Sequence, residues 1–384
     1  MVGQCRSDAI KIFICRLLYH AKISLGMKLF FDARYIRTDF HDGISRYSAE
    51  LGAALAKLTP VTFLICAKAQ IKLLPRNSRY ILIHTPTSPK ELLTALILNK
   101  YHPDIVFSPM QTMGSFGRQF KLILTLHDMI YYRHRTPPHQ LNRAIGLGWR
   151  LYHATYLPQR LTLNSADAIA TVSQTSRRDI LTASLTRREI IIVPNAAQDL
   201  SQYLHRPISL ATTPKNLVYM GSFMPYKNVE TLIAGMEFLP GYTLHLLSRV
   251  SPKRKAELLT LVPKNAKIIF HGGVTDEQYA QLLADNAIMV SASRDEGYGL
   301  PLAEALKLGV PAVVSDLAIY HEVAGNGALY FPAKDPMTFA DKVLLLNDLK
   351  LRKQIASSGR IHIDQFNWDK SAEILLRSAE KLIL

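Results

Sequence analysis

Short apolar segments alternate with segments of helical periodicity along most of this 384-residue chain, and this alternation restricts the folds available to it. The apolar segment 28–33 precedes a helical pattern that begins at Gly43, and a second apolar segment follows at 61–66. Strands that alternate with helices form parallel, doubly wound sheets, whose ligands bind at the carboxyl ends of the strands. An α/β fold of two or three domains is therefore predicted, at about 100–200 residues per domain. Further predicted strands lie at 80–84, 104–107, 121–126, 167–172, 190–193, 216–220, 243–247, 267–271, 287–290, 312–315 and 328–331.

The stretch RDEGYGLPLAEALKLGVP at 294–311 carries the clearest functional signal. The strand at 287–290 precedes it, and Pro301 fits the first turn of a helix, where its missing N–H has no partner to lose. Gly297 and Gly299 lie in the turn between strand and helix, where they let a ligand approach the backbone. Free N–H groups and the positive end of a helix dipole make such a turn typical of a phosphate site.

Two carboxylates lie beside this turn, Glu296 before it and Glu304 on the predicted helix. A carboxylate repels a phosphate but accepts hydrogen bonds from hydroxyl groups. The combination predicts a ligand that carries both phosphate and sugar. The alternative is an ordinary strand–helix connection with two solvated glutamates.

The stretch resembles the donor-binding signature of the retaining glycosyltransferases of family 4, in which two glutamates separated by seven residues bracket the sugar-nucleotide site. The similarity continues through Ser315-Asp316 and the segment 321–325 to 328–331. The resemblance implies the GT-B fold, with two Rossmann-like doubly wound domains that face each other across a cleft. It also implies a C-terminal helix that crosses back onto the first domain.

Domain boundaries follow from the resemblance and from composition. An N-terminal extension at 1–26 has two open interpretations: a basic amphipathic helix at a membrane interface, or an artefact of start-codon assignment, because Met27 precedes the usual family start. The other expected parts are an acceptor-side domain at 27–196, a linker at 197–214, a donor-binding domain at 215–362 and the cross-over helix at 363–384.

Candidate site residues of the first domain are Gly43, His127 and Asp128, which follow predicted strands. On the residues alone, Gly43 is equally an ordinary turn glycine and His127 is more often structural. The resemblance implies that Gly43 faces the donor diphosphate and that His127 reaches the transferred sugar, with Asp128 as its support.

Lys227 of the second domain follows a strand and a glycine, and on spacing alone it would be a surface lysine. The resemblance identifies it as the residue that neutralises the diphosphate. Some family members carry an arginine where this chain has Ser222, so the missing cation is either absent or supplied by Arg249 or Arg294. The resemblance also places Glu304 at the ribose hydroxyls and Glu296 at the sugar. The other predicted donor-binding residues are Gly221, Ser222, Arg249, Val274 (beside the base), Gly297, Tyr298, Gly299 and Leu300.

The sequence contains no Asp-x-Asp, the metal site of many glycosyltransferases of the other major fold. Lysine and helix N-termini can stabilise a departing diphosphate without a metal. We therefore expect no metal site and no cofactor, with a nucleotide-diphosphate sugar as donor substrate. Three cysteines without metal-ligand or redox spacing fit a reducing cytoplasm.

The net charge of +16 favours an anionic partner. Segment 118–160 has the largest excess of basic over acidic residues in the chain, with seven Arg or Lys and one acidic residue. Aromatic side chains are interleaved with them. This segment predicts an anionic membrane surface or a lipid-phosphate acceptor. A generally basic composition and a solvated helix face are the alternatives. Nucleic acid is not an expected partner, because no nucleic-acid-binding motif accompanies the charge.

Together these features predict a metal-independent retaining glycosyltransferase that moves a hexosyl group to a hydroxyl of an envelope lipid, a polysaccharide or another glycoconjugate. Similarity to mannosyltransferase-like members favours a mannosyl group from GDP-mannose. The alternatives are another GT-B enzyme, a phosphorylase or an epimerase, or a non-catalytic basic module at a membrane surface. The expected location is the cytoplasm, including the inner face of the cell membrane.

Overall fold

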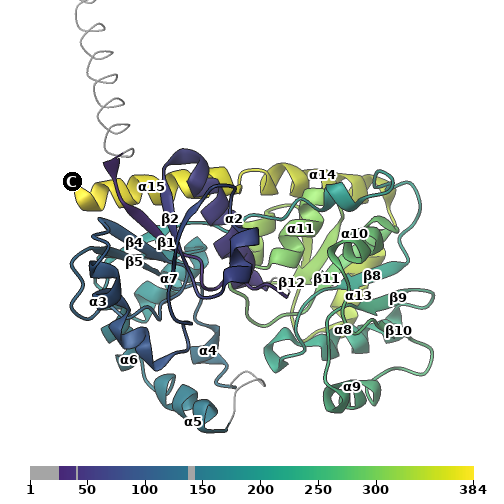
Figure 1. Cartoon of the computed structure of the whole chain (residues 1–384). Coiled ribbons are helices and arrows are strands. Elements are labelled where there is room, and N and C mark those ends of the chain that lie inside the picture. The colour runs from purple at the N-terminus through teal and green to yellow at the C-terminus, as the bar shows by residue number, and fades with distance from the viewer. Residues whose placement is uncertain (1–25, 40–41, 137–142) are drawn as a thin grey trace, which may run out of the picture. The chain divides into compact units, whose positions relative to one another are not determined.

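The computed structural model describes residues 26–39, 42–136 and 143–384, which form two compact units (Figure 1). Unit 1 comprises Met1–Pro194 and Trp368–Leu384, and unit 2 comprises Asn195–Asn367. The predicted N-terminal extension lies, but for its last residue, outside the described residues. Within the described ranges, no helix has the length and apolar character needed to cross a bilayer.

Unit 1 is built on a seven-stranded parallel sheet in the order β3-β2-β1-β4-β5-β6-β7. The chain's winding direction reverses between β1 and β4, as it does in the Rossmann fold, and ligands of such sheets bind outside the carboxyl ends of the strands at this point. β1, β4 and β6 are buried throughout, which explains why every residue in them except the last is apolar. The strands are β1 (Leu29–Asp32), β2 (Val61–Ile65), β3 (Arg79–Leu82), β4 (Ile105–Ser108), β5 (Lys121–Thr125), β6 (Ala168–Thr171) and β7 (Glu189–Ile192).

The last helix, α15 (Trp368–Ile383), belongs to unit 1 and packs along α2 (Gly43–Leu58), as Figure 1 shows. The hydroxyl of Ser371 on α15 donates to the carbonyl of Pro194 at 2.8 Å and ties the helix to the end of the sheet region. The expected return of the C-terminal helix is thereby confirmed. The other helical elements of this unit are η1 (Lys68–Leu73), η2 (Pro89–Leu93), α3 (Thr94–Asn99), α4 (Ile130–Arg133), α5 (Arg143–Tyr152), α6 (Leu157–Asn164) and α7 (Gln174–Thr182).

A buried ion network fixes the loop that follows β1. The guanidinium of Arg34, a residue only 4% exposed, donates to both oxygens of Asp32 at 2.7 and 2.9 Å. It also donates to both oxygens of Glu91 at 2.6 and 3.0 Å. These two bidentate ion pairs hold the loop after β1 against η2. The three charged side chains can be buried because each is paired with an opposite charge.

Unit 2 repeats the architecture with six parallel strands in the order β10-β9-β8-β11-β12-β13, so its reversal point lies between β8 and β11. The doubly wound α/β prediction is confirmed in both units. The strands are β8 (Asn216–Tyr219), β9 (Thr243–Leu246), β10 (Lys267–Phe270), β11 (Ala287–Ser291), β12 (Ala312–Ser315) and β13 (Ala328–Phe331). The helical elements are η3 (Leu200–Tyr203), η4 (Pro225–Lys227), α8 (Val229–Gly235), η5 (Met236–Phe238), α9 (Pro252–Leu259), α10 (Asp276–Ala284), α11 (Leu300–Leu308), α12 (Ala318–Ala324), α13 (Pro336–Leu345) and α14 (Leu349–Ile363).

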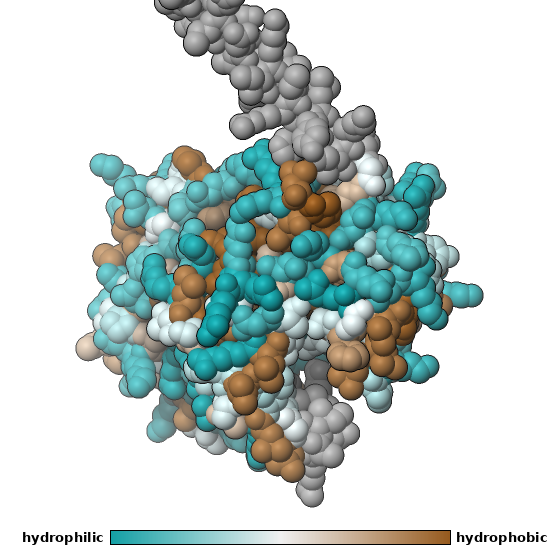
Figure 2. Space-filling model, turned by 90° about the vertical axis from the view of Figure 1, so that its left-hand side faces the viewer, coloured by the Kyte–Doolittle hydropathy of each residue, from teal (hydrophilic) through white to brown (hydrophobic). Residues whose placement is uncertain are grey.

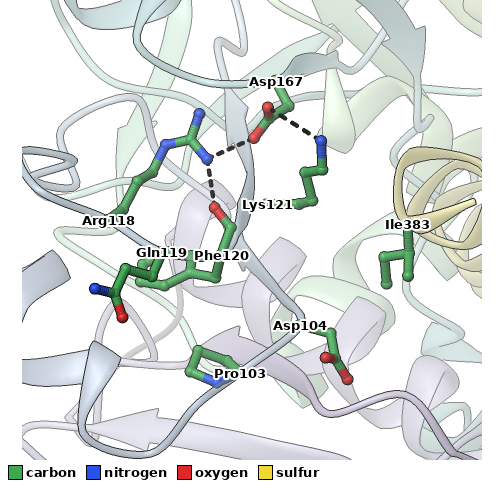
Figure 3. Close-up of a pocket in the computed structure, with 8 residues that line it drawn as sticks. All are labelled: Pro103, Asp104, Arg118, Gln119, Phe120, Lys121, Asp167 and Ile383. Atoms are coloured by element: carbon green, nitrogen blue, oxygen red, sulfur yellow. Dashed lines mark hydrogen bonds and ion pairs between the residues drawn. The ribbon is translucent and has the colours of Figure 1, made fainter.

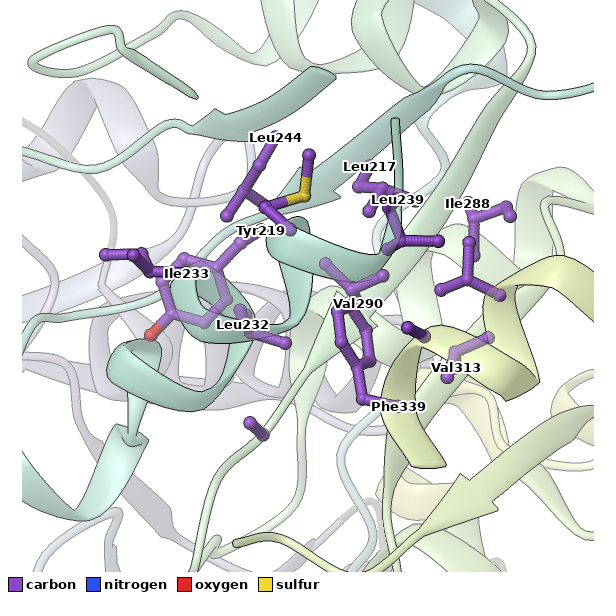
Figure 4. Close-up of a cluster of buried hydrophobic side chains, with 14 of the residues drawn as sticks. Leu217, Tyr219, Leu232, Ile233, Leu239, Leu244, Ile288, Val290, Val313 and Phe339 are labelled. Carbon is purple, nitrogen blue, oxygen red and sulfur yellow. The ribbon is translucent and has the colours of Figure 1, made fainter. Parts of the chain in front are cut away.

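One face of this sheet packs against α8 and α13 to form the core of unit 2 (Figure 4). Leu217, Ile288 and Val313 come from three neighbouring strands, and Leu232 of α8 and Phe339 of α13 cover them; each is fully buried. Because both β8 and β11 are anchored in this core, the segments that follow them start from fixed positions.

The predicted linker, 197–214, is part of unit 2 by its contacts. Its Tyr203 carbonyl accepts a hydrogen bond from Gln281, and its Leu210 carbonyl accepts one from Arg352 at 2.8 Å. These bonds attach the segment to α10 and α14 over part of its length.

Candidate functional site

The turn between β11 and α11 has the geometry that the sequence predicts. β11 ends at Ser291, and α11 begins at Leu300 with Pro301 in its first turn. Gly299 has a φ of 95°, and a Cβ at this position would lie 2.8 Å from Cε1 of Tyr320. Backbone conformation and lack of space both require glycine here.

Glu296, in this turn, receives three donors on one carboxylate oxygen. Its Oε1 lies 2.5 Å from Nζ of Lys227, 3.1 Å from Oγ of Ser293 and 3.2 Å from the hydroxyl of Tyr320. The side chains of Lys227 and Glu296 are 16% and 13% exposed, so the ion pair lies at the edge of solvent. The predicted cation and the predicted sugar-contacting carboxylate, from the segments after β8 and β11, therefore meet at the reversal point of the sheet.

Asn228 holds the Lys227 segment against the β11 turn. It adopts a left-handed conformation with φ 53°, and its amide donates to the carbonyls of Ala292 at 2.9 Å and Ala333 at 2.5 Å. Its side-chain oxygen accepts from Nη2 of Arg294 at 2.8 Å. Asparagine suits this position because it tolerates positive φ and can both donate and accept.

The two candidate replacements for the missing arginine lie on different segments of unit 2. Arg294 is exposed and bonds to the neutral amide of Asn228, so its charge has no carboxylate partner among the described residues. Arg249 follows β9 and is exposed, and its side chain covers Gly273, where a Cβ would lie 3.1 Å from the arginine Cγ. It too has no ion pair within the part of the chain that the structure describes.

Several other predicted residues surround this edge with their backbone rather than their side chains. The Gly221 N–H donates to the hydroxyl of Ser248 at 3.2 Å, and the Ser222 carbonyl accepts from Tyr219 at 2.7 Å. The Tyr298 side chain is 5% exposed, so burial raises the pKa of its phenol and only its backbone is positioned for a ligand. The remaining predicted residues follow β10 and β11 in the chain: Val274, Gly297, Leu300, and Glu304, which is 3% exposed.

Gly43 is exposed at the first residue of α2 in unit 1. Asp42 caps this helix, because its Oδ1 accepts from the backbone N–H of Ser45 at 2.8 Å. Its other oxygen lies 3.1 Å from Nε of Arg37. A carboxylate thus already satisfies part of the helix N-terminus that the resemblance assigns to the diphosphate.

His127 follows β5 and is fixed by a backbone carbonyl. Its Nε2 lies 2.8 Å from the oxygen of Pro109, so this nitrogen carries the hydrogen and Nδ1 is left as an acceptor. Burial lowers the pKa of His127, which favours the neutral ring. Tyr47 packs edge-on against the ring at 4.9 Å between centroids. Asp128, the predicted support, accepts from the backbone N–H of Ile130 at 2.9 Å.

A pocket of about 380 Å³ lies at the amino ends of strands in the unit 1 sheet (Figure 3). Asp104, Lys121 and Asp167 lie at or next to the amino ends of β4, β5 and β6, away from the edge where doubly wound sheets bind ligands. Arg118 already pairs with Asp167 at 2.7 Å. The lining residues are Pro103, Asp104, Arg118, Gln119, Phe120, Lys121, Asp167 and Ile383, and we assign this cavity no role in the site.

The structure contains no cluster of three His, Cys, Asp or Glu side chains that could hold a metal ion, among residues 26–39, 42–136 and 143–384. The charges at the β8–β11 edge are those of lysine, arginine and glutamate. This set suits an anionic ligand with hydroxyl groups.

Comparison with known proteins matches two parts of the chain, each to its own glycosyltransferase family model. Residues 201–362 match the family described as glycosyl transferases group 1, and residues 41–198 match glycosyltransferase family 4. The chain is 29% identical over 177 residues to the serotype-specific mannosyltransferase WbdA of Escherichia coli, covering 44% of this chain and 21% of WbdA. It is 28% identical over 262 residues to the E. coli O-antigen chain mannosyltransferase B, covering 60% of this chain and 68% of that protein. The chain thus spans about a fifth of the length of WbdA.

Solved structures share the fold at low sequence identity. Sucrose-phosphate synthase from Thermosynechococcus elongatus superimposes with a TM-score of 0.69 at 17% identity, over 93% of this chain and 99% of that chain. Anabaena HepE, solved in complex with UDP and glucose, gives a TM-score of 0.66 at 17% identity over the same shares of the two chains.

A substitution at Gly299 tests the packing of the turn. Gly299→Ala is expected to cost about 2–4 kcal/mol of unfolding free energy, because left-handed strain and a clash with the Tyr320 ring add together. Gly309→Ala is the matched control: Gly309 has a φ of 78° but nothing within 4 Å of an added Cβ, so strain alone applies. Urea denaturation measures both, and equal losses would show that the contact with Tyr320 is not tight.

Proposed function

Because the chain belongs to the family 4 glycosyltransferases of the GT-B fold, we propose that it transfers a hexosyl group from a nucleotide-diphosphate sugar to an acceptor hydroxyl. One observation carries the proposal: Lys227 and Glu296 meet at the reversal point of the unit 2 sheet, beside the N-terminus of α11. A cation and free amides suit a diphosphate, and a carboxylate suits the hydroxyl groups of a sugar.

The chemical step requires negative charge to develop on the departing diphosphate as the sugar becomes oxocarbenium-like. Preorganised positive groups at that position lower the barrier. The ammonium of Lys227 has three N–H groups and uses one for Glu296, so it retains donors for a phosphate oxygen. The N-terminal amides of α11 supply further donors.

Some family members have an arginine where this chain has Ser222. Arg249 and Arg294 supply the missing positive charge. Both are exposed at this side of unit 2, and neither is neutralised by a carboxylate among the described residues. Glu304 holds the ribose hydroxyls and Glu296 contacts the transferred sugar. His127, with its acceptor nitrogen Nδ1, and Gly43 remain the proposed contacts from unit 1.

The proposed donor is GDP-mannose, the product retains the anomeric configuration, and the acceptor is a hydroxyl of an envelope glycan or glycolipid. Support comes from relatives, since WbdA, mannosyltransferase B and the O-antigen chain mannosyltransferase RfbU of Salmonella typhimurium are all named mannosyltransferases. RfbU is 22% identical over 319 residues, covering 80% of this chain and 88% of that protein.

We also propose that unit 1 approaches an anionic membrane surface. Exposed leucines on α5 and α6, 60–68% accessible, accompany the basic residues of segment 118–160. Figure 2 shows hydrophobic side chains in brown as separate patches among hydrophilic ones on one face of the molecule. Leucines beside arginines fit binding at the interface of an anionic bilayer. The leucines are Leu147, Leu151, Leu157 and Leu161.

A panel of sugar nucleotides tests the function. GDP-mannose is expected to raise the melting temperature and to be turned over with release of GDP, while UDP-glucose and UDP-galactose have smaller effects. Turnover should be unchanged by EDTA, because Lys227 and helix amides neutralise the leaving group. If no sugar nucleotide binds, the proposal is wrong. If turnover requires inorganic phosphate in place of a glycan acceptor, the enzyme is a phosphorylase.

A further inference from the structure

Tyr320, on α12, lies directly behind Glu296. It is 1% exposed, and its hydroxyl is 2.8 Å from Oγ of Ser291 and 3.2 Å from Oε1 of Glu296. Its ring occupies the space that an added Cβ at Gly299 would need. The phenol therefore touches both the β11 turn and the carboxylate within that turn.

The direction of these hydrogen bonds follows from the protonation of the phenol. Burial, and next the charge of Glu296, raise the pKa of Tyr320 well above its ordinary value, so the phenol keeps its proton. It then donates to Glu296, which as a carboxylate can only accept. Ser291 can donate in turn to the phenol oxygen.

The two oxygens of Glu296 have different surroundings. Oε1 receives Lys227, Ser293 and Tyr320, whereas Oε2 has no hydrogen-bond partner among the described residues. A void of about 10 Å³ is lined in part by Glu296, Tyr320 and Lys227. Such a volume holds about one water molecule and no sugar ring. Oε2 is thus the oxygen of Glu296 that remains open to a hydroxyl group of a ligand.

We infer that Tyr320 is a positioning residue for the glycosyl transfer: with Ser293 it holds Oε1 of Glu296 and so directs Oε2 toward the transferred sugar. The inference rests on the proposed function. Lys227 also bonds Oε1, but it must share its donors with the diphosphate. The hydroxyls of Ser293 and Tyr320 keep the Glu296 carboxylate oriented while Lys227 contacts both this carboxylate and the diphosphate.

The backbone around Tyr320 is itself held in place. Its carbonyl accepts from the hydroxyl of Tyr330 at 3.4 Å, and the same hydroxyl bonds the carbonyl of Gly325 at 2.5 Å. The Tyr330 ring stacks on His321 with 3.8 Å between centroids. A phenylalanine at position 320 would keep the ring packing and lose only the hydroxyl.

Tyr320→Phe tests the inference on the full-length protein. It is expected to lower kcat about tenfold or more while the donor KM changes less than about threefold, because orientation of the sugar is lost rather than donor binding. Tyr242→Phe is the matched control, since that phenol is 3% exposed, bonds Asn347 at 2.8 Å and touches no predicted site residue. A kcat for Tyr320→Phe equal to that of Tyr242→Phe overturns the inference.

A double-mutant cycle separates positioning from general packing. In the Glu296→Ala background, the additional Tyr320→Phe substitution is expected to lower kcat less than twofold, because the residue acts through that carboxylate. Full additivity would show a role independent of Glu296 and overturn the inference. Wild-type protein that turns over no sugar nucleotide would refute the proposed function itself, whereas active wild type with unaffected Tyr320→Phe refutes only the role of Tyr320.

Discussion

Replacing Lys227 with methionine is expected to lower kcat by roughly 100- to 1,000-fold, the cost of removing one preorganised donor from developing negative charge. Methionine keeps most of the side-chain volume, so the fold should be retained. The lysine lies 2.5 Å from Glu296, and its loss also leaves that carboxylate with only its two hydroxyl donors. Release of the nucleoside diphosphate under saturating donor measures the effect.

The control for this substitution is Lys255→Met on α9. Lys255 is exposed, and its ammonium lies 5.5 Å from the ring centre of Phe270, away from the β11 turn. The Lys255→Met substitution removes one positive charge from unit 2, as Lys227→Met does, but it removes no contact with Glu296. Its kcat should therefore stay within about twofold of wild type. If the two variants lose activity equally, net charge matters and the local contact does not. If Lys227→Met retains full activity, another cation neutralises the leaving group.

Replacing Arg34 with methionine is expected to cost about 3–5 kcal/mol of unfolding free energy, the usual cost of removing one member of a buried ion pair. Asp32 and Glu91, which are 0% and 8% exposed, would then face each other without a cation. Urea denaturation at pH 7 measures the loss.

Arg352→Met is the matched control for the buried charge. Arg352 is 2% exposed and donates to the carbonyls of Leu210, Leu346 and Asn347 rather than to carboxylates. Its removal leaves neutral acceptors, so we expect a loss of about 1–3 kcal/mol. A loss of similar size in both variants would contradict the proposed importance of the Arg34 network.

The succession of strands was predictable because most strands are buried within their sheets, although the edge strands β3 and β10 are largely exposed. All thirteen strands of the two sheets lie at or within two residues of the predicted segments. A buried parallel strand reads as a continuous apolar run, and the β11–turn–α11 unit adds glycine and proline at positions where the backbone requires them. These are local constraints, and local constraints are visible along a sequence.

The partners of the site residues were not predictable in the same way. The resemblance implies Asp128 as the support of His127, and the structure adds a partner that no spacing indicated, the carbonyl of Pro109 at Nε2 of His127. Tyr320 lies between two segments that match the family, yet nothing in its spacing indicates a bond to Glu296, 24 residues earlier. Arg34 gave no sequence signal, since its partner Glu91 is 57 residues away.

The sequence alone determined the doubly wound architecture, the phosphate-type turn at 294–301 and the choice of Lys227, Glu296 and Glu304 as candidate residues. Only the tertiary structure decided that Lys227, Ser293 and Tyr320 share one oxygen of Glu296 and leave the other without a hydrogen-bond partner among the described residues. The physical reason is the distance along the chain between the residues that interact. Periodicity and turn chemistry depend on neighbouring residues, whereas a hydrogen bond of about 3 Å depends on how separate strands are placed in one sheet.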